Sequence, residues 1–253
     1  SHKSGDAPDI FTCDADIAGY ADAGVVMDVT DLMTDDFVDG AFNACMVDGK
    51  AYAIPMDMPF RVIYYNKEDL KAIGWTDEEV EALLEKIRNK EVLFDDFIDI
   101  CQEVVEKGGA KYGLVHRPSA GNDFYDIINA LGGVYYNDQN QLVFDNQGIL
   151  KFFQFTYDNA QTRGITPDNL NQLGWDTINK MVGTGEAFAY YGPMFSATYV
   201  AQAAGRSTEE FAKQEAFVLF PAADASGQPF AVAAPQTIAI SADTKYPEVC
   251  KDI

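Results

Sequence analysis

The stretch AIPMDMPFRVIYYNKEDL, residues 53–70, begins like a β-strand and ends in the polar residues of a turn and a helix start. Between these parts, Pro55 and Pro59 hold the chain extended around a single carboxylate, Asp57. This pattern predicts that the chain leaves one packed body here and enters another. We expect Asp57 to lie on the hinge, at the floor of a ligand cleft.

Length and charge limit the classes of protein that fit. With 253 residues, the chain can build one large or two modest domains with a full core. Hydrophobic residues make up 47% and aromatic residues 13%, which argues against disorder. The net charge of -22, from 18 basic and 40 acidic residues, repels nucleic-acid phosphates and anionic lipid headgroups. We therefore expect no nucleic-acid partner and no membrane-surface role.

Short β-rich runs alternate with longer segments of helical period along the chain, a pattern that favours an α/β fold with mainly parallel strands. The clearest predicted helix covers residues 76–90, where Thr76 and Glu79 have the spacing of a capping box. The next predicted helix covers residues 93–109 and places Cys101 on its apolar face. Cys101 is therefore expected to be a core thiol.

Metal and hydrolase signatures are weak or absent. Asp14, Asp16 and Gly19 have the spacing of the start of an EF-hand loop, but Ala18 and Val25 break that pattern. The four cysteines are far apart and form no zinc-type pair. The sequence contains neither H-E-x-x-H nor G-x-S-x-G. It predicts no metal, no cofactor and no catalytic residue.

Aromatic residues gather around a Gly-Pro turn in FAYYGPMFSATY, residues 188–199. Tyr191 and Phe195 flank this turn at the C-terminal end of a predicted strand, and ligands bind at such ends in open α/β sheets. Core packing is the alternative interpretation, and for Phe188 it is the one that we favour.

Five motifs occur in a familiar order: APDIF (7–11), GYADAG (19–24), YAIPMDMPFRVIYYNKEDL (52–70), GEAFAYYGPMF (185–195) and QPFAVAAPQTIAIS (228–241). Together they resemble the extracellular solute-binding proteins of ABC importers, in particular the maltose-binding-protein-like, sugar-binding branch (family 1). The resemblance covers nearly the whole chain. Each motif alone is weak, and their shared order and spacing make the assignment specific.

The resemblance implies an α/β, two-lobed periplasmic-binding-protein-like fold of type II. Residues 1–57 would form part of the first lobe, residues 58–230 the second lobe, and residues 231–253 the return strand and helix start of the first lobe. An opening βαβ portion and the closing helices of the family have no counterpart in the sequence. The resemblance thus predicts a fragment that lacks the first and last segments.

The resemblance also implies that a ligand is held in a cleft between the two lobes. The ligand-binding residues that it implies are Asp14, Asp16, Asp57, Arg61, Asn122, Asp123, Tyr125, Tyr191, Met194, Phe195 and Gln236. Met194 stands where relatives have a stacking tryptophan, so the neighbouring Tyr191 and Phe195 would have to supply the aromatic surface. Carboxylates that accept hydrogen bonds from hydroxyls, beside flat aromatic faces, suit sugars.

The function implied is non-enzymatic binding of a mono- or oligosaccharide and its delivery to the permease subunits of an ABC transporter. The location implied is extracellular or periplasmic, with tethering to the membrane through a lipid anchor outside this sequence. Two alternatives stay open for the ligand: a polyamine, which carboxylates and aromatics would suit, or an anion, for which Arg61 and Arg117 are the nearby cations. A glycoside hydrolase is the alternative from another class, and it would need two carboxylates about 5 to 10 Å apart.

Overall fold

The computed structural model describes residues 7–13, 17–119, 121–137, 139, 141–233 and 235–253, with the side chain of Asn122 excepted. The chain divides into two compact units. Unit 1 comprises Ser1–Pro59 with Ala233–Ile253, and unit 2 comprises Phe60–Val232. Unit 1 is therefore built from both ends of the chain, and unit 2 is one continuous segment.

Unit 1 contains a three-stranded antiparallel sheet in the order β1-β9-β4. Its strands are β1 (Ile10–Cys13), β4 (Ile54–Asp57) and β9 (Gln236–Ile240). A short hairpin of β2 (Met46–Val47) and β3 (Lys50–Ala51) and the helices α1 (Ile17–Asp22) and α10 (Pro247–Asp252) complete it, with 3-10 turns at Thr30–Leu32 and Ala41–Cys45. The central strand comes from the C-terminal segment, so the two ends of the chain share one core.

Unit 2 contains a four-stranded sheet in the order β6-β7-β5-β8. Its strands are β5 (Arg61–Asn66), β6 (Tyr112–Val115), β7 (Ala187–Pro193) and β8 (Glu215–Val218). Side chains alternate along β5, so that Ile63 and Tyr65 enter the core on one face and Val62 and Tyr64 enter the core on the other. Both faces of this sheet are therefore buried.

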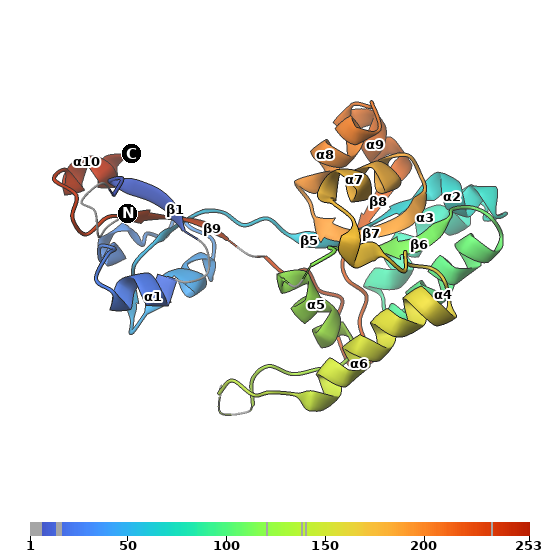
Figure 1. Cartoon of the computed structure of the whole chain (residues 1–253), viewed down its shortest axis with the longest axis horizontal. Coiled ribbons are helices and arrows are strands. Elements are labelled where there is room, and N and C mark those ends of the chain that lie inside the picture. The colour runs from blue at the N-terminus through green and yellow to red at the C-terminus, as the bar shows by residue number, and fades with distance from the viewer. Residues whose placement is uncertain (1–6, 14–16, 120, 138, 140, 234) are drawn as a thin grey trace. The chain divides into compact units, whose positions relative to one another are not determined.

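Helices cover the two faces of the unit 2 sheet (Figure 1). The helices α3 (Asp77–Arg88), α4 (Phe94–Glu106), α5 (Asn122–Ala130) and α6 (Asn146–Tyr157) pack on one face, and α7 (Trp175–Gly183), α8 (Ser196–Ala203) and α9 (Thr208–Gln214) pack on the other. The short helix α2 (Lys67–Ala72) follows β5 directly, and further short helical turns lie at Asp158–Thr162 and Leu170–Gln172. Unit 2 is thus a three-layer α/β body, as the alternation of strand and helix patterns predicts.

Local sequence signals explain where the helices begin. The capping box predicted at Thr76 and Glu79 is confirmed, with each side chain accepting a hydrogen bond from the other residue's backbone N–H. Asp145 caps α6 by accepting hydrogen bonds from the backbone of Gln147 and Gly148. Cys101 is fully buried in the core, as predicted.

The expectation of mainly parallel strands is wrong. Among the strands of the described residues, β6 and β7 pair in parallel, and the other pairs in both units are antiparallel. The alternation of strand and helix along the sequence reports the layers of a fold and not the direction of its strands. In unit 2, β5 runs antiparallel to both of its neighbours, β7 and β8.

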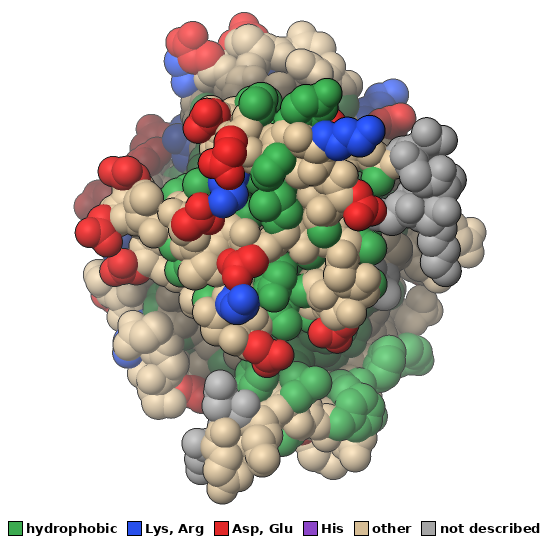
Figure 2. All heavy atoms as spheres, turned by 90° about the vertical axis from the view of Figure 1, so that its left-hand side faces the viewer, with side chains coloured by type: hydrophobic (Ala, Val, Ile, Leu, Met, Phe, Trp, Pro, Cys, Tyr) green, Lys and Arg blue, Asp and Glu red, His purple; other side chains and the backbone are tan. Residues whose placement is uncertain are grey.

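Acidic side chains are spread over the face that Figure 2 shows and are not gathered in one patch, in keeping with the net charge of -22. No described helix combines the length and the apolar character needed to cross a lipid bilayer.

Candidate functional site

A pocket of about 430 Å³ lies in unit 2, at the sheet edge where β6 and β7 end. Because β5 runs antiparallel to β7, its first residue, Arg61, lies opposite Pro193 at the end of β7. The pocket is lined by Arg61, Arg117, Asp123, Trp175, Asp176, Asn179, Pro193, Phe195, Ser196 and Tyr199. The carboxyl ends of parallel strands are where ligands bind in open α/β sheets, and this volume is within the usual range of ligand sites.

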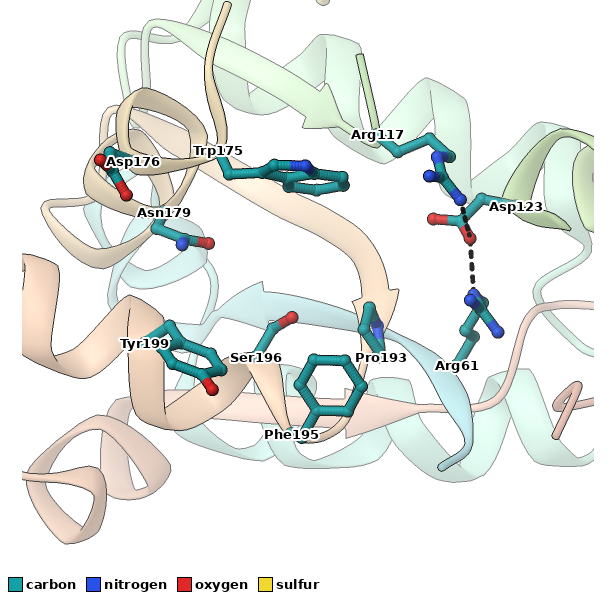
Figure 3. Close-up of a pocket in the computed structure, with 10 residues that line it drawn as sticks. All are labelled: Arg61, Arg117, Asp123, Trp175, Asp176, Asn179, Pro193, Phe195, Ser196 and Tyr199. Carbon is teal, nitrogen blue, oxygen red and sulfur yellow. Dashed lines mark hydrogen bonds and ion pairs between the residues drawn. The ribbon is translucent and has the colours of Figure 1, made fainter. Parts of the chain in front are cut away.

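One wall of the pocket is charged (Figure 3). Asp123, in the first turn of α5, is almost fully buried and accepts a hydrogen bond from Nε of Arg61 at 2.5 Å. Nη1 of Arg117, from the loop after β6, lies 3.7 Å from the same carboxylate oxygen. Two guanidinium groups thus face one carboxylate.

Aromatic rings form the walls on either side. Trp175, the first residue of α7, lies across one side of the pocket, while Phe195 and Tyr199, at the start of α8, lie on the other (Figure 3). Between 44% and 57% of the surface of each of these three residues is exposed. Their faces are therefore open to a ligand.

Polar side chains complete the lining. Asn179 projects from α7, and the buried Ser196 begins α8. Asp176 is exposed, and Figure 3 shows its carboxylate on the far side of the pocket from the two arginines. Rings that can cover an apolar face, next to hydrogen-bonding groups at the edge, suit a small ring that carries hydroxyls.

A second hollow in unit 2, of about 500 Å³, has a different character. Its lining is mostly aromatic and aliphatic, with Tyr125, Tyr135 and Phe144 among the residues. Its one acidic lining residue, Asp145, is occupied in capping α6 and in accepting a hydrogen bond from the backbone of Val134. This hollow offers few polar groups to a sugar, so the first pocket is the better candidate.

The structure brings three of the predicted ligand-binding residues together in the pocket: Arg61, Asp123 and Phe195. Tyr125 instead lines the apolar hollow, and Met194 lines a third hollow beside Val62 and Leu219.

Tyr191 is placed differently from our expectation. It is 1% exposed, packs edge-on against Phe220 in the core, and donates a hydrogen bond to Asp126 at 2.6 Å. Burial raises the pKa of Asp126 to about 6. As the second residue before Pro193 on β7, Tyr191 points into the core beneath the sheet edge, so core packing is the interpretation that fits it.

The other predicted residues belong to unit 1 or are not fully described. Asp57 and Gln236 are exposed in unit 1, where the backbone N–H of Gln236 donates to Oδ1 of Asp57 at 3.2 Å. Asn122 is the first residue of α5, and its side chain is not described. Asp14 and Asp16 lie outside the described residues. Within the described residues, no group of three or more side chains could hold a metal ion.

Six residues that line the pocket were missed by the sequence analysis: Trp175, Asp176, Asn179, Pro193, Ser196 and Tyr199. A usable signal was present, because Trp175 is one of two tryptophans and directly follows Gly174 at the start of a predicted helix. The second arginine, Arg117, was considered only for an anionic ligand.

Residues 2–252 match the model of the bacterial extracellular solute-binding protein family. The chain belongs to this family. The solute-binding protein has 28% identity over 127 residues to an arabinooligosaccharide-binding protein of Halalkalibacterium halodurans, a match that covers 49% of this chain and 25% of that protein. It has 24% identity over 199 residues to the maltodextrin-binding protein MdxE of Bacillus subtilis, covering 77% and 45%.

A solved structure shares the fold of this solute-binding protein. The maltose-bound MalE3 of T. maritima superimposes with a TM-score of 0.76 at 16% identity, covering 99% of this chain and 62% of that one. This confirms the periplasmic-binding-protein-like α/β fold. The chain spans about a quarter to under half of the length of these two curated relatives, and about three fifths of the solved structure.

Proposed function

We propose that the protein binds a carbohydrate without altering it and that the unit 2 pocket receives one sugar ring. The observation that carries this proposal is the arrangement of Trp175 on one side of the pocket and Phe195 and Tyr199 on the other, with polar groups at the edge. An aromatic face covers the C–H side of a pyranose, while the carboxylate, amide and guanidinium groups bond its hydroxyls.

The relatives support a sugar ligand. Two curated relatives are named for arabinooligosaccharide and maltodextrin binding, and the solved structure contains maltose. We extend the sugar class to this chain, but not any one of these sugars, because its identity to these proteins is 28% or less. Asp57 and Gln236 stay predictions from the resemblance.

We also propose delivery of the bound sugar to the permease subunits of an ABC transporter, outside the cell and close to its membrane. The family of extracellular solute-binding proteins supports this role. Tethering through a lipid anchor belongs to the same proposal and follows from the resemblance alone.

A polyamine is a weaker candidate. Two guanidinium groups line the pocket within reach of a single buried carboxylate, and they would repel a polycation. The only other carboxylate among the lining residues, Asp176, lies across the pocket from them.

Hydrolysis of the bound sugar is the other alternative, and we propose that it does not occur. The family is one of non-enzymatic binding proteins. Asp123, the buried carboxylate of the pocket, is engaged by Arg61, and an acid held in this way is poorly placed to donate a proton to a glycosidic oxygen. Release of reducing ends from a bound oligosaccharide, lost in Asp123→Asn, would contradict this proposal.

Isothermal titration calorimetry of this chain tests the proposal. The panel comprises neutral and acidic monosaccharides, arabino-oligosaccharides, maltodextrins and spermidine. Trp175→Ala should weaken sugar binding about tenfold or more, since a stacked ring contributes about 1.5 kcal/mol. Phe153→Ala, which removes an exposed ring on α6 outside the pocket, should leave affinity unchanged. Equal loss in both variants, or binding of spermidine alone, would contradict the proposal.

A further inference from the structure

The charged wall of the pocket has two arginines, Arg61 and Arg117, but one buried carboxylate, Asp123. Arg61 already forms the short contact to Asp123, at 2.5 Å, and Arg117 approaches the same oxygen at 3.7 Å. The three groups together have one excess positive charge. The chain as a whole has a net charge of -22, so a cationic surplus at the pocket runs against its general character.

The two guanidinium groups also have donors to spare. Nη1 of Arg61 and Nε of Arg117 are both buried, and neither has a hydrogen-bond partner among the described residues. Leaving a buried donor of a charged group without a partner is costly, so such groups normally have one. Both atoms have almost no exposed surface, so an acceptor on the ligand would reach them only after a small movement of the two side chains.

The surroundings of Arg117 hold its guanidinium at the pocket. The group lies 5.8 Å from the ring of Trp175, a cation–π distance, and packs closely on Gly121. Gly121 has an extended backbone that any residue can adopt, yet a Cβ there would overlap the guanidinium of Arg117. The space left by this glycine therefore sets the position of Arg117.

The other lining residues do not cancel the surplus, but the buried Asp126 on α5 lies near Arg61 outside the lining, and because burial raises its pKa to about 6 it reduces the surplus when it ionises above that pH. Asp176 lies on the far side, with its carboxylate away from the arginines (Figure 3). The helices α7 and α8 begin at the pocket with Trp175 and Ser196, and the N-terminal ends of helices favour negative charge. These helix dipoles add to the preference of the two arginines for a negatively charged ligand.

We propose that the pocket selects an acidic sugar, a uronic acid residue whose carboxylate is bound by Arg61 and Arg117 while its ring lies between Trp175 and Phe195. This inference rests on the proposed sugar-binding function. The planar guanidinium fork matches a carboxylate, and the single excess charge matches a monoanion better than a phosphate dianion. The hydroxyls of a neutral sugar can accept hydrogen bonds from these donors, but they would leave the excess positive charge unbalanced.

Calorimetry with matched sugars tests this selectivity. The probes are galacturonate against galactose, glucuronate against glucose, and trigalacturonate as an oligomer, with sodium acetate as the anion without a sugar ring. At low ionic strength we expect the chain to bind an acid sugar at least about tenfold more tightly than its neutral partner. This ratio should fall in 0.5 M NaCl, because salt weakens the attraction between the charges.

Two variants test whether Arg117 provides the preference for acidic over neutral sugars. Arg117→Gln should reduce the ratio of acidic to neutral affinity below about threefold. Gly121→Ala should do the same by displacing the guanidinium while all charges are kept. Lys111→Gln is the matched control, because it removes a positive charge from an exposed residue of unit 2 that does not line the pocket, and it should keep the full ratio.

The outcomes separate this inference from the proposed function. Binding of neutral sugars with equal or greater affinity overturns the acidic-sugar inference and leaves sugar binding standing. Acetate that competes as well as the uronates overturns it too, because the pocket would then be a simple anion site. Failure of every sugar, acidic and neutral, contradicts both. Retention of the full ratio in Arg117→Gln and Gly121→Ala overturns the assignment of the preference to Arg117.

Discussion

Unit 2 buries two groups of carboxylates in opposite electrostatic settings. Asp123 lies between Arg61 and Arg117 at the pocket. Asp69 on α2 and Glu215 at the start of β8 are buried near each other, and neither forms an ion pair with a cation among the described residues. The first group has cations in excess, whereas the second has none bonded to it.

Asp69 and Glu215 have raised pKa values, which favour their protonated and neutral forms. Burial, with a smaller contribution from the charge of Glu68, raises the pKa of Asp69 to about 7. Burial and the charge of Asp69 raise the pKa of Glu215 to about 8. Lys67 and Arg206 oppose the rise from a distance, but Lys67 bonds Glu81 and Arg206 bonds Gln214 and the carbonyl of Gly183.

The difference between these two groups of carboxylates indicates which of them needs a ligand. A buried acid without a cation can become neutral by binding a proton. An arginine cannot lose its charge at ordinary pH, so surplus guanidinium groups keep their demand for an anion. We therefore assign ligand binding to the pocket of Asp123 and a role in pH-dependent stability to Asp69 and Glu215.

The largest expected effect comes from breaking the paired group. Arg61→Met should lower the free energy of unfolding by about 3 to 5 kcal/mol, because it leaves the buried Asp123 without its short-range partner. Urea unfolding monitored by circular dichroism measures this loss. Arg88→Met, which removes an exposed arginine paired with Glu85, should cost less than about 1 kcal/mol. A loss below about 1 kcal/mol for Arg61→Met would show that Arg117 alone suffices.

Replacing Glu215, which has no cation bonded to it among the described residues, should have the opposite effect to Arg61→Met and raise the free energy of unfolding at alkaline pH. In the folded protein the pKa of Glu215 is raised to about 8, above the value of about 4.3 expected for an unfolded chain. The folded state therefore binds more protons between these values, and the stability that Glu215 contributes is complete below about pH 4 and lost as pH rises through 8. Glu215→Gln should make the protein more stable than the wild type at pH 8.5, by about 1 to 2 kcal/mol.

Urea unfolding of wild type and Glu215→Gln at pH 5, 7 and 8.5 measures this difference. Between pH 5 and 8.5 the wild type should lose stability more steeply than the variant. Glu186→Gln, a change at a partly exposed acid paired with Lys111, should keep the slope of the wild type. Parallel curves for wild type and Glu215→Gln would mean that Glu215 is charged in the folded state throughout this range.

The smallest effect is expected at an exposed acid in unit 1. Asp57 accepts one hydrogen bond, from the backbone of Gln236 at 3.2 Å, and is open to water. Asp57→Ala should therefore change the free energy of unfolding by less than about 1 kcal/mol. Differential scanning calorimetry provides the measurement, with Asp57→Asn as the variant that keeps an acceptor. A large drop in Tm in Asp57→Ala alone would make this carboxylate a structural link between β4 and β9.

Local features of the fold could be predicted from the sequence. The capping box at Thr76, the cap at Asp145 and the burial of Cys101 each depend on residues within a few positions of one another. The order of five motifs was enough to indicate the family. Arg61 and Phe195, which lie within two of those motifs, and Asp123, which lies outside them, line the candidate pocket.

Features that depend on distant segments could not be predicted in this way. The direction of β5 relative to β7 is set by how the chain enters unit 2, and this register brings Arg61 to Pro193. Trp175 joins the pocket because α7 begins beside the ends of strands that are remote in sequence. The hydrophobic pattern of β7 does not reveal that Tyr191 points into the core, because an aromatic ring at a strand end suits a core or a cleft equally well.

The central claim is that a sugar ring lies against Trp175, and the fluorescence of that residue tests it most directly. The chain has two tryptophans, and Trp75→Phe leaves Trp175 as the one tryptophan whose emission is followed. Titration of this variant with a sugar that binds the wild type should change its emission in a saturable way, with the Kd that calorimetry gives. Binding detected by calorimetry with no change in the emission of Trp175 would contradict the account.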